Sequence, residues 1–207
     1  FLGIVKYNRK TNGFNFSKYI IYTNFNDTVI FLLSSASKNL KDRLMDQIYQ
    51  NKTGKNNFFI LISKPMEKLS DISDVYSRLN KSIEIIKAIP ALKNKKIIFY
   101  DEISYYVLLH KLANQQETEE IVTEALAPVL KLNESEREIM LNTIYHYVNN
   151  LGNKTKAAEN AYMHRNTFNY RIDKLTKLLN SDLSSSDEIY KYKIILDLYY
   201  LMVNRPH

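Results

Sequence analysis

Residues 153–180 read NKTKAAENAYMHRNTFNYRIDKLTKLLN, and this pattern predicts two helices separated by a tight turn. The first helix is short and carries three small residues, Ala157, Ala158 and Ala161. The second helix is longer, and its apolar residues recur at helical spacing: Phe168, Ile172, Leu175 and Leu179. Small residues on one helix allow a second helix to cross it closely, as a helix-turn-helix requires. We therefore predict a helix-turn-helix whose second helix spans about residues 165–180 and enters the major groove of DNA.

Polar side chains lie on the opposite face of that second helix. A rotation of about 100° per residue places Asn166, Tyr170 and Lys177 opposite the apolar stripe. Asn169 lies beside them. Because an asparagine side chain can form two hydrogen bonds with the edge of adenine, we expect Asn166 and Asn169 to contact DNA. Tyr170 has two interpretations, stacking on a sugar or covering a neighbouring helix.

Basic residues gather around the same motif. Residues 153–180 hold six lysines and arginines against two acidic residues, whereas the excess in residues 1–112 is scattered and is typical of a solvated face. Arg165 and Thr167 stand at the predicted start of the second helix, where backbone amides and the helix dipole favour phosphate. Lys154 and Lys156 on the first helix are placed to contact the sugar-phosphate backbone. This local cluster indicates DNA binding better than the net charge of +7 does.

Two residues of the motif have structural roles to consider. Arg171 lies only about 60° from the apolar stripe on a helical wheel. It either contacts a phosphate or forms an ion pair with Glu159 or Asp197. His164 falls where the N-cap of the second helix belongs, so we expect it to cap that helix rather than to contact DNA.

The run from His164 to Arg171 closely resembles the signature of the PucR/CdaR family of bacterial transcriptional regulators. Residues 147–153 and the pair Ala157-Ala158 resemble it too, and the resemblance covers about residues 135–205. The spacing is also similar to the DNA-binding end of the factor for inversion stimulation. Many such motifs have glycine where this chain has Tyr162. The resemblance implies a regulator that binds double-stranded DNA, with these candidate contact residues: Lys154, Lys156, Arg165, Asn166, Thr167, Asn169, Tyr170, Arg171 and Lys174.

The rest of the second half is predicted to be helical. An amphipathic helix runs from Glu119 to Leu130, with Pro128 expected to end or kink it. Asn133 and Glu136 form a capping-box pattern before a helix that Gly152 ends. The residues expected on the buried face of that helix are Met140, Ile144, Tyr147, Val148 and Leu151. A last helix over residues 187–204 is apolar nearly all round, which predicts burial in its own core or against a partner subunit.

The first half is predicted to be mixed α/β. Strands are expected over residues 2–7, 19–22, 28–33, 58–63 and 96–100, with a turn at 24–27. Residues 40–49 have helical spacing, and a second helix begins at an N-cap offered by Ser70-Asp71 and stops before Pro90. This order suggests an antiparallel-rich sheet covered by helices on one face. The linker to the second half lies within residues 110–120.

In the PucR/CdaR family a degenerate GGDEF-like domain often precedes the DNA-binding domain. Residues 1–112 look like one, most clearly at 62–65, 69–72 and 99–102. Where an active cyclase has its Gly-Gly-Asp/Glu-Glu-Phe hairpin, this chain has Asn24-Phe25-Asn26-Asp27. The glycines that admit nucleotide phosphates and the adjacent acidic pair that holds metal are missing, so we expect no cyclase activity. No nucleophile–base pair can be placed either, and an enzyme is the least favoured class.

Composition excludes several other classes. The chain has no cysteine, which removes disulfides, thiol catalysis and cysteine-ligated zinc and fits a reducing cytoplasm. Its four histidines lack metal-ligand spacing, and no cofactor or metal is expected. No apolar run reaches the roughly 20 residues of a membrane span. The chain begins with Phe1 rather than methionine, which suggests a piece of a longer protein.

We therefore expect an α+β chain in two domains. Residues 1–112 would form a GGDEF-like domain with a ferredoxin-like sheet and helices, and residues 113–207 an all-helical PucR-type DNA-binding domain. We expect a cytoplasmic homodimer whose small-molecule effector acts through an N-terminal region absent from this chain. The alternatives are a regulatory module that binds a nucleotide or metabolite, and a protein-interaction module without DNA specificity of its own.

Overall fold

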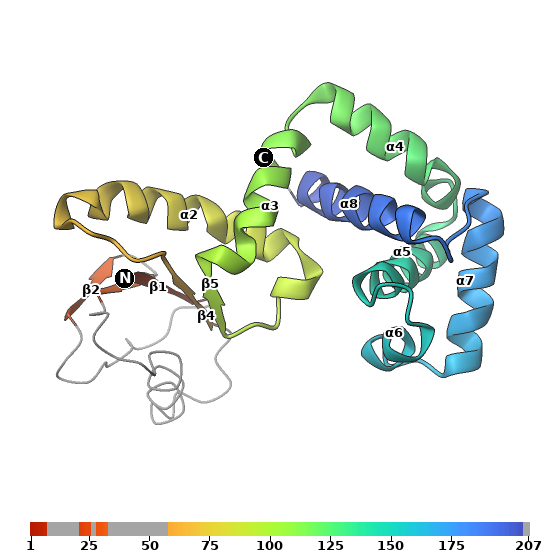
Figure 1. Ribbon diagram of the computed structural model, residues 1–207, viewed down its shortest axis with the longest axis horizontal. Helices are drawn as coiled ribbons and strands as arrows, with labels where there is room; N and C mark the ends of the chain where they lie inside the picture. Colours follow the sequence, from red (N-terminus) through yellow and green to blue (C-terminus); the bar gives the residue numbers. More distant parts are fainter. Residues whose placement is uncertain (8–20, 26–27, 33–57, 205–207) are drawn as a thin grey trace. The chain divides into compact units, whose positions relative to one another are not determined.

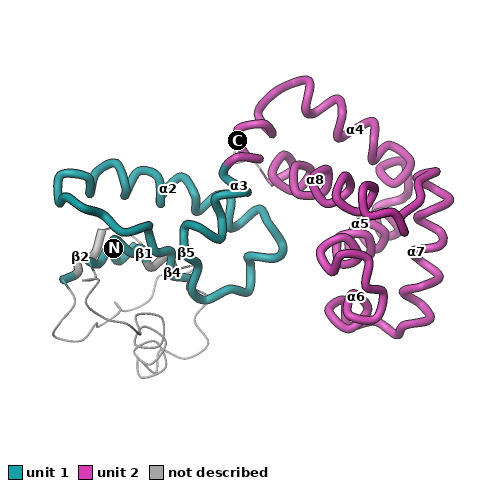
Figure 2. The backbone as a smooth tube through the Cα atoms, viewed as in Figure 1, with its two compact units in different colours: residues 1–107, 206 teal, residues 108–205, 207 magenta. Residues whose placement is uncertain are grey.

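The computed structural model describes residues 1–7, 21–25, 28–32 and 58–204. They form two compact units, an α/β unit over residues 1–107 and a helical unit that begins at Leu108 (Figure 2). The predicted α+β class is confirmed. The predicted helix over residues 40–49 lies outside the described residues. In the described part of the chain, no helix is both long and apolar enough to cross a membrane.

A five-stranded sheet organises the α/β unit (Figure 1). Its strands are β1 (Leu2–Tyr7), β2 (Ile21–Phe25), β3 (Thr28–Leu32), β4 (Phe58–Ile62) and β5 (Ile97–Phe99). The order across the sheet is β2-β3-β1-β4-β5. The antiparallel-rich sheet is confirmed, because β1 pairs antiparallel with both β3 and β4, and β2 with β3, whereas β4 and β5 are parallel.

The hairpin between β2 and β3 is tighter than the sequence suggests. We expected a turn at residues 24–27, but Asn24 and Phe25 belong to β2 and are paired with Val29 and Thr28. The β-sheet register, which depends on the partner strand, therefore overrides the turn preference of asparagine at position 24. Residues 26–27 lie outside the described part of the chain.

Helix α2 (Ile72–Ala88) covers one face of the sheet (Figure 1). Its apolar residues at helical spacing are buried as predicted, namely Val75, Leu79, Ile83 and Ile86. The helix ends before Pro90, as predicted, because Ile89 is extended. The expected N-cap is wrong in one respect: Asp71 precedes the helix with helical backbone angles and makes no side-chain capping bond. A short 3-10 helix, Leu69–Asp71, precedes α2 directly, and no side chain caps the N-terminus of α2.

Two helices follow the sheet with a short connection. Helix α3 (Tyr100–Ala113) and helix α4 (Gln116–Leu130) are separated by Asn114 and Gln115 alone. The expected linker at 110–120 is therefore mostly helical, and α4 begins three residues before the predicted Glu119. Pro128 lies in the last turn of α4, which ends two residues later.

The helical unit adds four more helices. They are α5 (Glu134–Asn149), α6 (Lys154–Asn160), α7 (Arg165–Leu179) and α8 (Ser186–Val203). Asn133 caps α5 as predicted, since its Oδ1 accepts a hydrogen bond from the Glu136 amide at 3.0 Å. Helix α7 packs on α4, α5 and α6, and α8 packs on α4 and α5.

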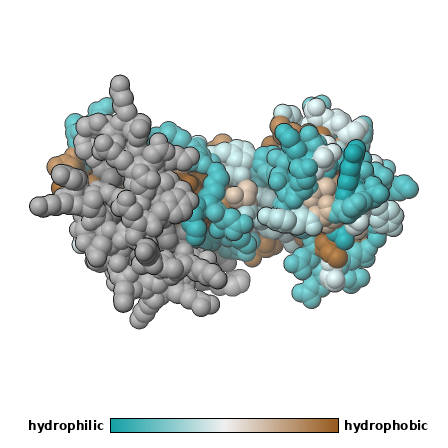
Figure 3. Space-filling model, turned by 90° about the horizontal axis from the view of Figure 1, so that it is seen from below, coloured by the Kyte–Doolittle hydropathy of each residue, from teal (hydrophilic) through white to brown (hydrophobic). Residues whose placement is uncertain are grey.

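Helix α8 is only partly buried. Six of its apolar residues lie in the core: Ile189, Tyr192, Ile195, Leu196, Leu198 and Leu201. Tyr190, Ile194 and Val203 are exposed, so this chain alone covers only part of the apolar circumference. The other expected way of burying it, against a partner subunit, stays a prediction. The face of the helical unit visible in Figure 3 is mostly hydrophilic, with hydrophobic side chains at the surface in a few places.

The end of α5 differs from the prediction by one residue. Leu151, expected on the buried face, is 62% exposed and has a φ of +50°, because it takes the left-handed position after the helix. The amide of Gly152 donates to the carbonyl of Tyr147 at 3.1 Å, which closes a Schellman motif with Leu151 at its left-handed position. Gly152 follows with a φ of +78°.

We predict that Gly152→Ala destabilises the helical unit. A Cβ at this position would lie 2.7 Å from Cδ1 of the buried Ile189, and the positive φ disfavours any side chain. The free energy of unfolding should fall by about 1–3 kcal/mol, measured by thermal unfolding followed by circular dichroism. Combining Gly152→Ala with Ile189→Val, which removes Cδ1, should recover part of the loss, and an unchanged Tm in Gly152→Ala would contradict the prediction.

Candidate nucleic-acid interface

Helices α6 and α7 form the predicted helix-turn-helix. Ala157 and Ala158 of α6 are buried, with exposed fractions of 0% and 2%, and α6 packs on both α5 and α7. The predicted apolar stripe of α7 is confirmed, since its four residues are all buried: Phe168, Ile172, Leu175 and Leu179. The buried stripe fixes which face of α7 remains open to solvent.

The turn between the two helices is built on a left-handed tyrosine. Tyr162 has a φ of +51°, the conformation that glycine usually supplies at this point. The amide of Met163 donates to the carbonyl of Ala158 at 2.9 Å, and that of Tyr162 to Glu159 at 3.0 Å. These two bonds form a Schellman motif. The side chain of Tyr162 is 99% exposed.

Both helices of the motif have capped N-termini. The predicted cap of α7 is confirmed, because the Nδ1 of His164 accepts a hydrogen bond from the Asn166 amide at 3.3 Å. Asn153 caps α6, accepting at 3.0 Å from the amide of Lys156. The expected capping role of His164 is therefore present in the structure, and its side chain is also exposed.

The solvent face of α7 holds four of the candidate residues. Arg165, Asn166, Thr167 and Tyr170 are exposed, and Lys156 is exposed on α6. These five side chains form no hydrogen bond or ion pair within the described part of the chain. We call them the open face.

The other four candidates are held within the domain. Lys154 forms an ion pair with Asp173 at 3.4 Å, and Lys174 forms one with Glu136 of α5. The hydrogen bond from Lys174 to Glu136 raises the pKa of Lys174. These pairs link α6 and α5 to α7.

Arg171 and Asn169 also turn inward. The Nη1 of Arg171 contacts the Sδ of Met163 at 3.3 Å, in the turn that precedes α7. Asp197, one of its expected partners, instead pairs with Lys193 at 3.0 Å. Asn169 is half-buried, and its Oδ1 is buried with no hydrogen-bond partner among the described residues.

Two further residues of the motif are exposed, although neither is among the candidate contact residues. Lys177 lies on the solvent side of α7, as the helical wheel indicates, and Tyr162 projects from the turn. The sequence signal for Tyr162 is its place at the turn, where related motifs have glycine.

A short alanine-bearing helix, a tight turn and a longer helix with an open polar face define a helix-turn-helix domain. Residues 140–198, from α5 into α8, match the PucR C-terminal helix-turn-helix domain. These residues therefore form a helix-turn-helix domain of the PucR type, which confirms the resemblance read from the sequence for this part of the chain.

One curated relative aligns with most of the chain. The chain is 27% identical over 168 residues to the proline-responsive transcriptional activator PutR of Bacillus subtilis. The alignment covers 80% of this chain but 39% of that relative, so the chain spans about two fifths of the relative's length. No solved structure matches the chain significantly.

We predict that His164→Ala weakens the start of α7. Removing the acceptor leaves the Asn166 amide without its cap, at a cost of about 1 kcal/mol. Hydrogen exchange should become faster at the amides of the first turn of α7. His164→Ser restores a capping oxygen and should keep exchange slow, so equal exchange in the two variants would contradict a capping role.

Proposed function

We propose that this chain belongs to a transcriptional regulator that binds double-stranded DNA through α7. The observation that carries the proposal is the open face of a PucR-type helix-turn-helix domain, where Arg165, Asn166, Thr167 and Tyr170 stand together on one helix. A helix in the major groove presents such side chains to base edges, while basic residues on the preceding helix contact phosphates.

Among the open-face residues, Asn166 is our choice for base recognition. It is exposed in the first turn of α7, the part of a recognition helix that reaches the base edges. Asn169 is a weaker candidate, because its Oδ1 is turned into the domain and a paired contact with adenine needs both amide atoms. Lys156 and Arg165 would contact phosphates.

We further propose that the regulator acts as a homodimer. Tyr190, Ile194 and Val203 leave apolar surface on α8 uncovered in this chain, and a second copy would cover it. A twofold dimer binds two half-sites about one helical turn apart. We also propose that a small molecule controls the regulator, because the Bacillus relative is named as proline-responsive. The proposal does not extend to the identity of that molecule.

For the first half of the chain we propose a degenerate GGDEF-like domain within residues 1–112, followed by the DNA-binding domain over 113–207. The support is the strand order β2-β3-β1-β4 with antiparallel neighbours, as in a ferredoxin-like sheet. The β2–β3 hairpin stands where an active cyclase has its glycine and acidic motif, which this sequence lacks. The domain would therefore have a structural or regulatory role.

A selection of genomic DNA fragments with the purified chain, at two salt concentrations, tests the function. Enrichment of a palindromic or direct-repeat motif, with binding that weakens steeply as salt rises, is the expected result. Binding without enrichment would mean that only backbone affinity is present. No binding at low salt would overturn the proposal and favour a protein-interaction module.

We predict that Asn166→Ala reduces discrimination between operator and unrelated DNA. The loss should be about 1–3 kcal/mol of the difference in binding free energy, the usual contribution of a paired base contact. Fluorescence anisotropy with both DNAs measures it. Asn142→Ala removes an exposed asparagine from α5 and serves as the matched control. Equal discrimination in Asn166→Ala and the unmodified chain would contradict the assignment.

We predict that Lys156→Gln weakens binding to all DNA sequences alike. The slope of log affinity against log salt should become shallower by about one for each phosphate that the variant no longer neutralises. Lys131→Gln, which removes an exposed lysine just after α4, should leave the slope unchanged. A salt slope that responds equally to both substitutions would count against a phosphate contact at Lys156.

A further inference from the structure

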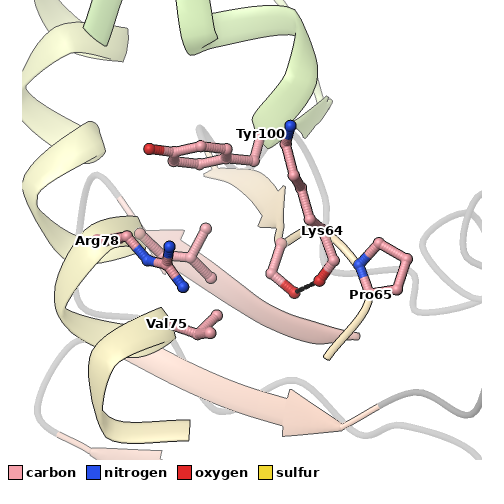
Figure 4. Close-up of a pocket in the computed structure, with 7 residues that line it drawn as sticks. Lys64, Pro65, Val75, Arg78 and Tyr100 are labelled. Carbon is pink, nitrogen blue, oxygen red and sulfur yellow. Dashed lines mark hydrogen bonds between the residues drawn. The ribbon is translucent and has the colours of Figure 1, made fainter. Parts of the chain in front are cut away.

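A small pocket lies in the α/β unit, outside the carboxyl ends of the parallel strands β4 and β5 (Figure 4). Three elements supply its walls: the residues that follow β4, one face of α2, and Tyr100, which follows β5 and begins α3. In open α/β sheets, ligands bind in crevices at the carboxyl ends of the strands. Here β4 and β5 are parallel, so the pocket lies in the corresponding place beside this pair of strands.

The interior of the pocket is largely apolar. Val75 and Leu79 of α2 are buried and lie one turn apart, so they share the face of the helix that lines the pocket. Ser63 is also buried, but its hydroxyl is already used within the fold. It donates to the carbonyl of Lys64 at 2.5 Å and accepts from the amide of Leu2 at 2.9 Å.

One cation that lines the pocket, the exposed Arg78, has no ion-pair partner in the described part of the chain. The Nζ of Lys64 lies 2.7 Å from the Oδ1 of Asp101, so these two charges offset each other. The guanidinium of Arg78 forms no hydrogen bond or ion pair within the part of the chain that the structure describes. Figure 4 shows this guanidinium reaching into the pocket from α2, with the phenol ring of Tyr100 on another side and its hydroxyl directed toward α2. A ligand with one negative charge would complement this arrangement.

The size of the pocket limits the ligand. Its volume is about 60 Å³, and a water molecule occupies roughly 10–15 Å³ by the same measure, so a nucleotide is too large. A short apolar group fits the walls formed by Val75 and Leu79, whereas inorganic phosphate would keep more of its hydration in solution.

We propose that this pocket binds a small monocarboxylate with a short alkyl group. The carboxylate accepts two hydrogen bonds from the guanidinium of Arg78, the geometry for which arginine is suited. The hydroxyl of Tyr100 donates a further hydrogen bond, and the alkyl group lies against Val75 and Leu79. The proposal concerns the α/β unit alone and does not depend on DNA binding by the helical unit.

A titration of the whole chain with isobutyrate, followed by two-dimensional amide NMR at constant ionic strength, tests the proposal. Saturable shifts are expected at the amides of residues 63–64, 78–79 and 100. Arg78→Gln should weaken binding about tenfold or more, as removal of a charge-assisted hydrogen-bond pair does. Lys81→Gln, which removes another exposed cation from the same helix, should leave the affinity unchanged.

Two comparisons on the unmodified chain keep the test independent of how Arg78→Gln folds. Isobutyramide has the shape of isobutyrate without its charge and should bind at least tenfold more weakly. Sodium phosphate should cause no saturable shift at these residues. The proposal is wrong if isobutyrate gives no saturable shift there, if isobutyramide binds equally well, if phosphate binds in its place, or if a folded Arg78→Gln variant, judged by an unchanged Tm, retains full affinity.

Discussion

The helix-turn-helix depends on the close packing of the short helix α6. Its Ala157 and Ala158 are buried, α6 packs on both α5 and α7, and Phe168 of α7 is fully buried. With seven residues, α6 is far below the roughly 12–15 residues at which an isolated helix is marginally stable. Its stability must therefore come from this packing and from its caps. A larger side chain at either alanine would fit only if α6 moved relative to α5 or α7, which would disturb the helix-turn-helix.

The same unit places a residue other than glycine in the left-handed conformation at the ends of three helices. Schellman-type bonds follow α5, α6 and α7, and the left-handed residues are Leu151, Tyr162 and Asn180. Leucine and tyrosine each lose about 1 kcal/mol or more in this conformation relative to glycine, so the surrounding packing must offset that loss at Leu151 and Tyr162, whereas asparagine tolerates it better. The conformation also decides exposure: Leu151 and Tyr162 are large apolar residues, yet 62% and 99% of their surface is open to solvent.

Periodicity in the sequence predicts the buried faces well, because a core helix must keep apolar residues at fixed spacing. The four stripe residues of α7 and the apolar positions of α2 are buried as expected. The misplaced residues lie at the ends of elements. Leu151 fits the stripe of α5 by spacing, but the helix ends before it, and Asn24 has turn chemistry but pairs with Val29. The ends depend on backbone bonds to neighbouring residues, which spacing does not reveal.

In the candidate site too, the sequence predicts some features correctly and misses those that depend on tertiary packing. Sequence places Asn166 on the solvent face of α7 correctly, because that face is fixed by the stripe alone. It does not reveal that Lys174 pairs with Glu136, since these residues are 38 positions apart and meet only when α5 packs on α7. The burial of the Asn169 Oδ1 also depends on how neighbouring helices pack, and a helical wheel carries no information on that packing.

These pairings change what the basic cluster can contribute to DNA binding. Six basic residues lie within 153–180, but Lys154 and Lys174 have carboxylate partners, and Arg171 contacts Met163. Lys156, Arg165 and Lys177 remain exposed. Each phosphate neutralised contributes about 0.9 to the salt slope, so these three alone would give a slope near 3 for one domain, half of what the count of cations suggests.

The ion pair of Lys154 with Asp173 is exposed and therefore weak, and a phosphate could take the place of Asp173. The carboxylate of Asp173 would then lie near the DNA without a cation and would repel it. The geometry thus favours modest affinity for one domain, and tight binding then requires base contacts or a second domain on the same DNA.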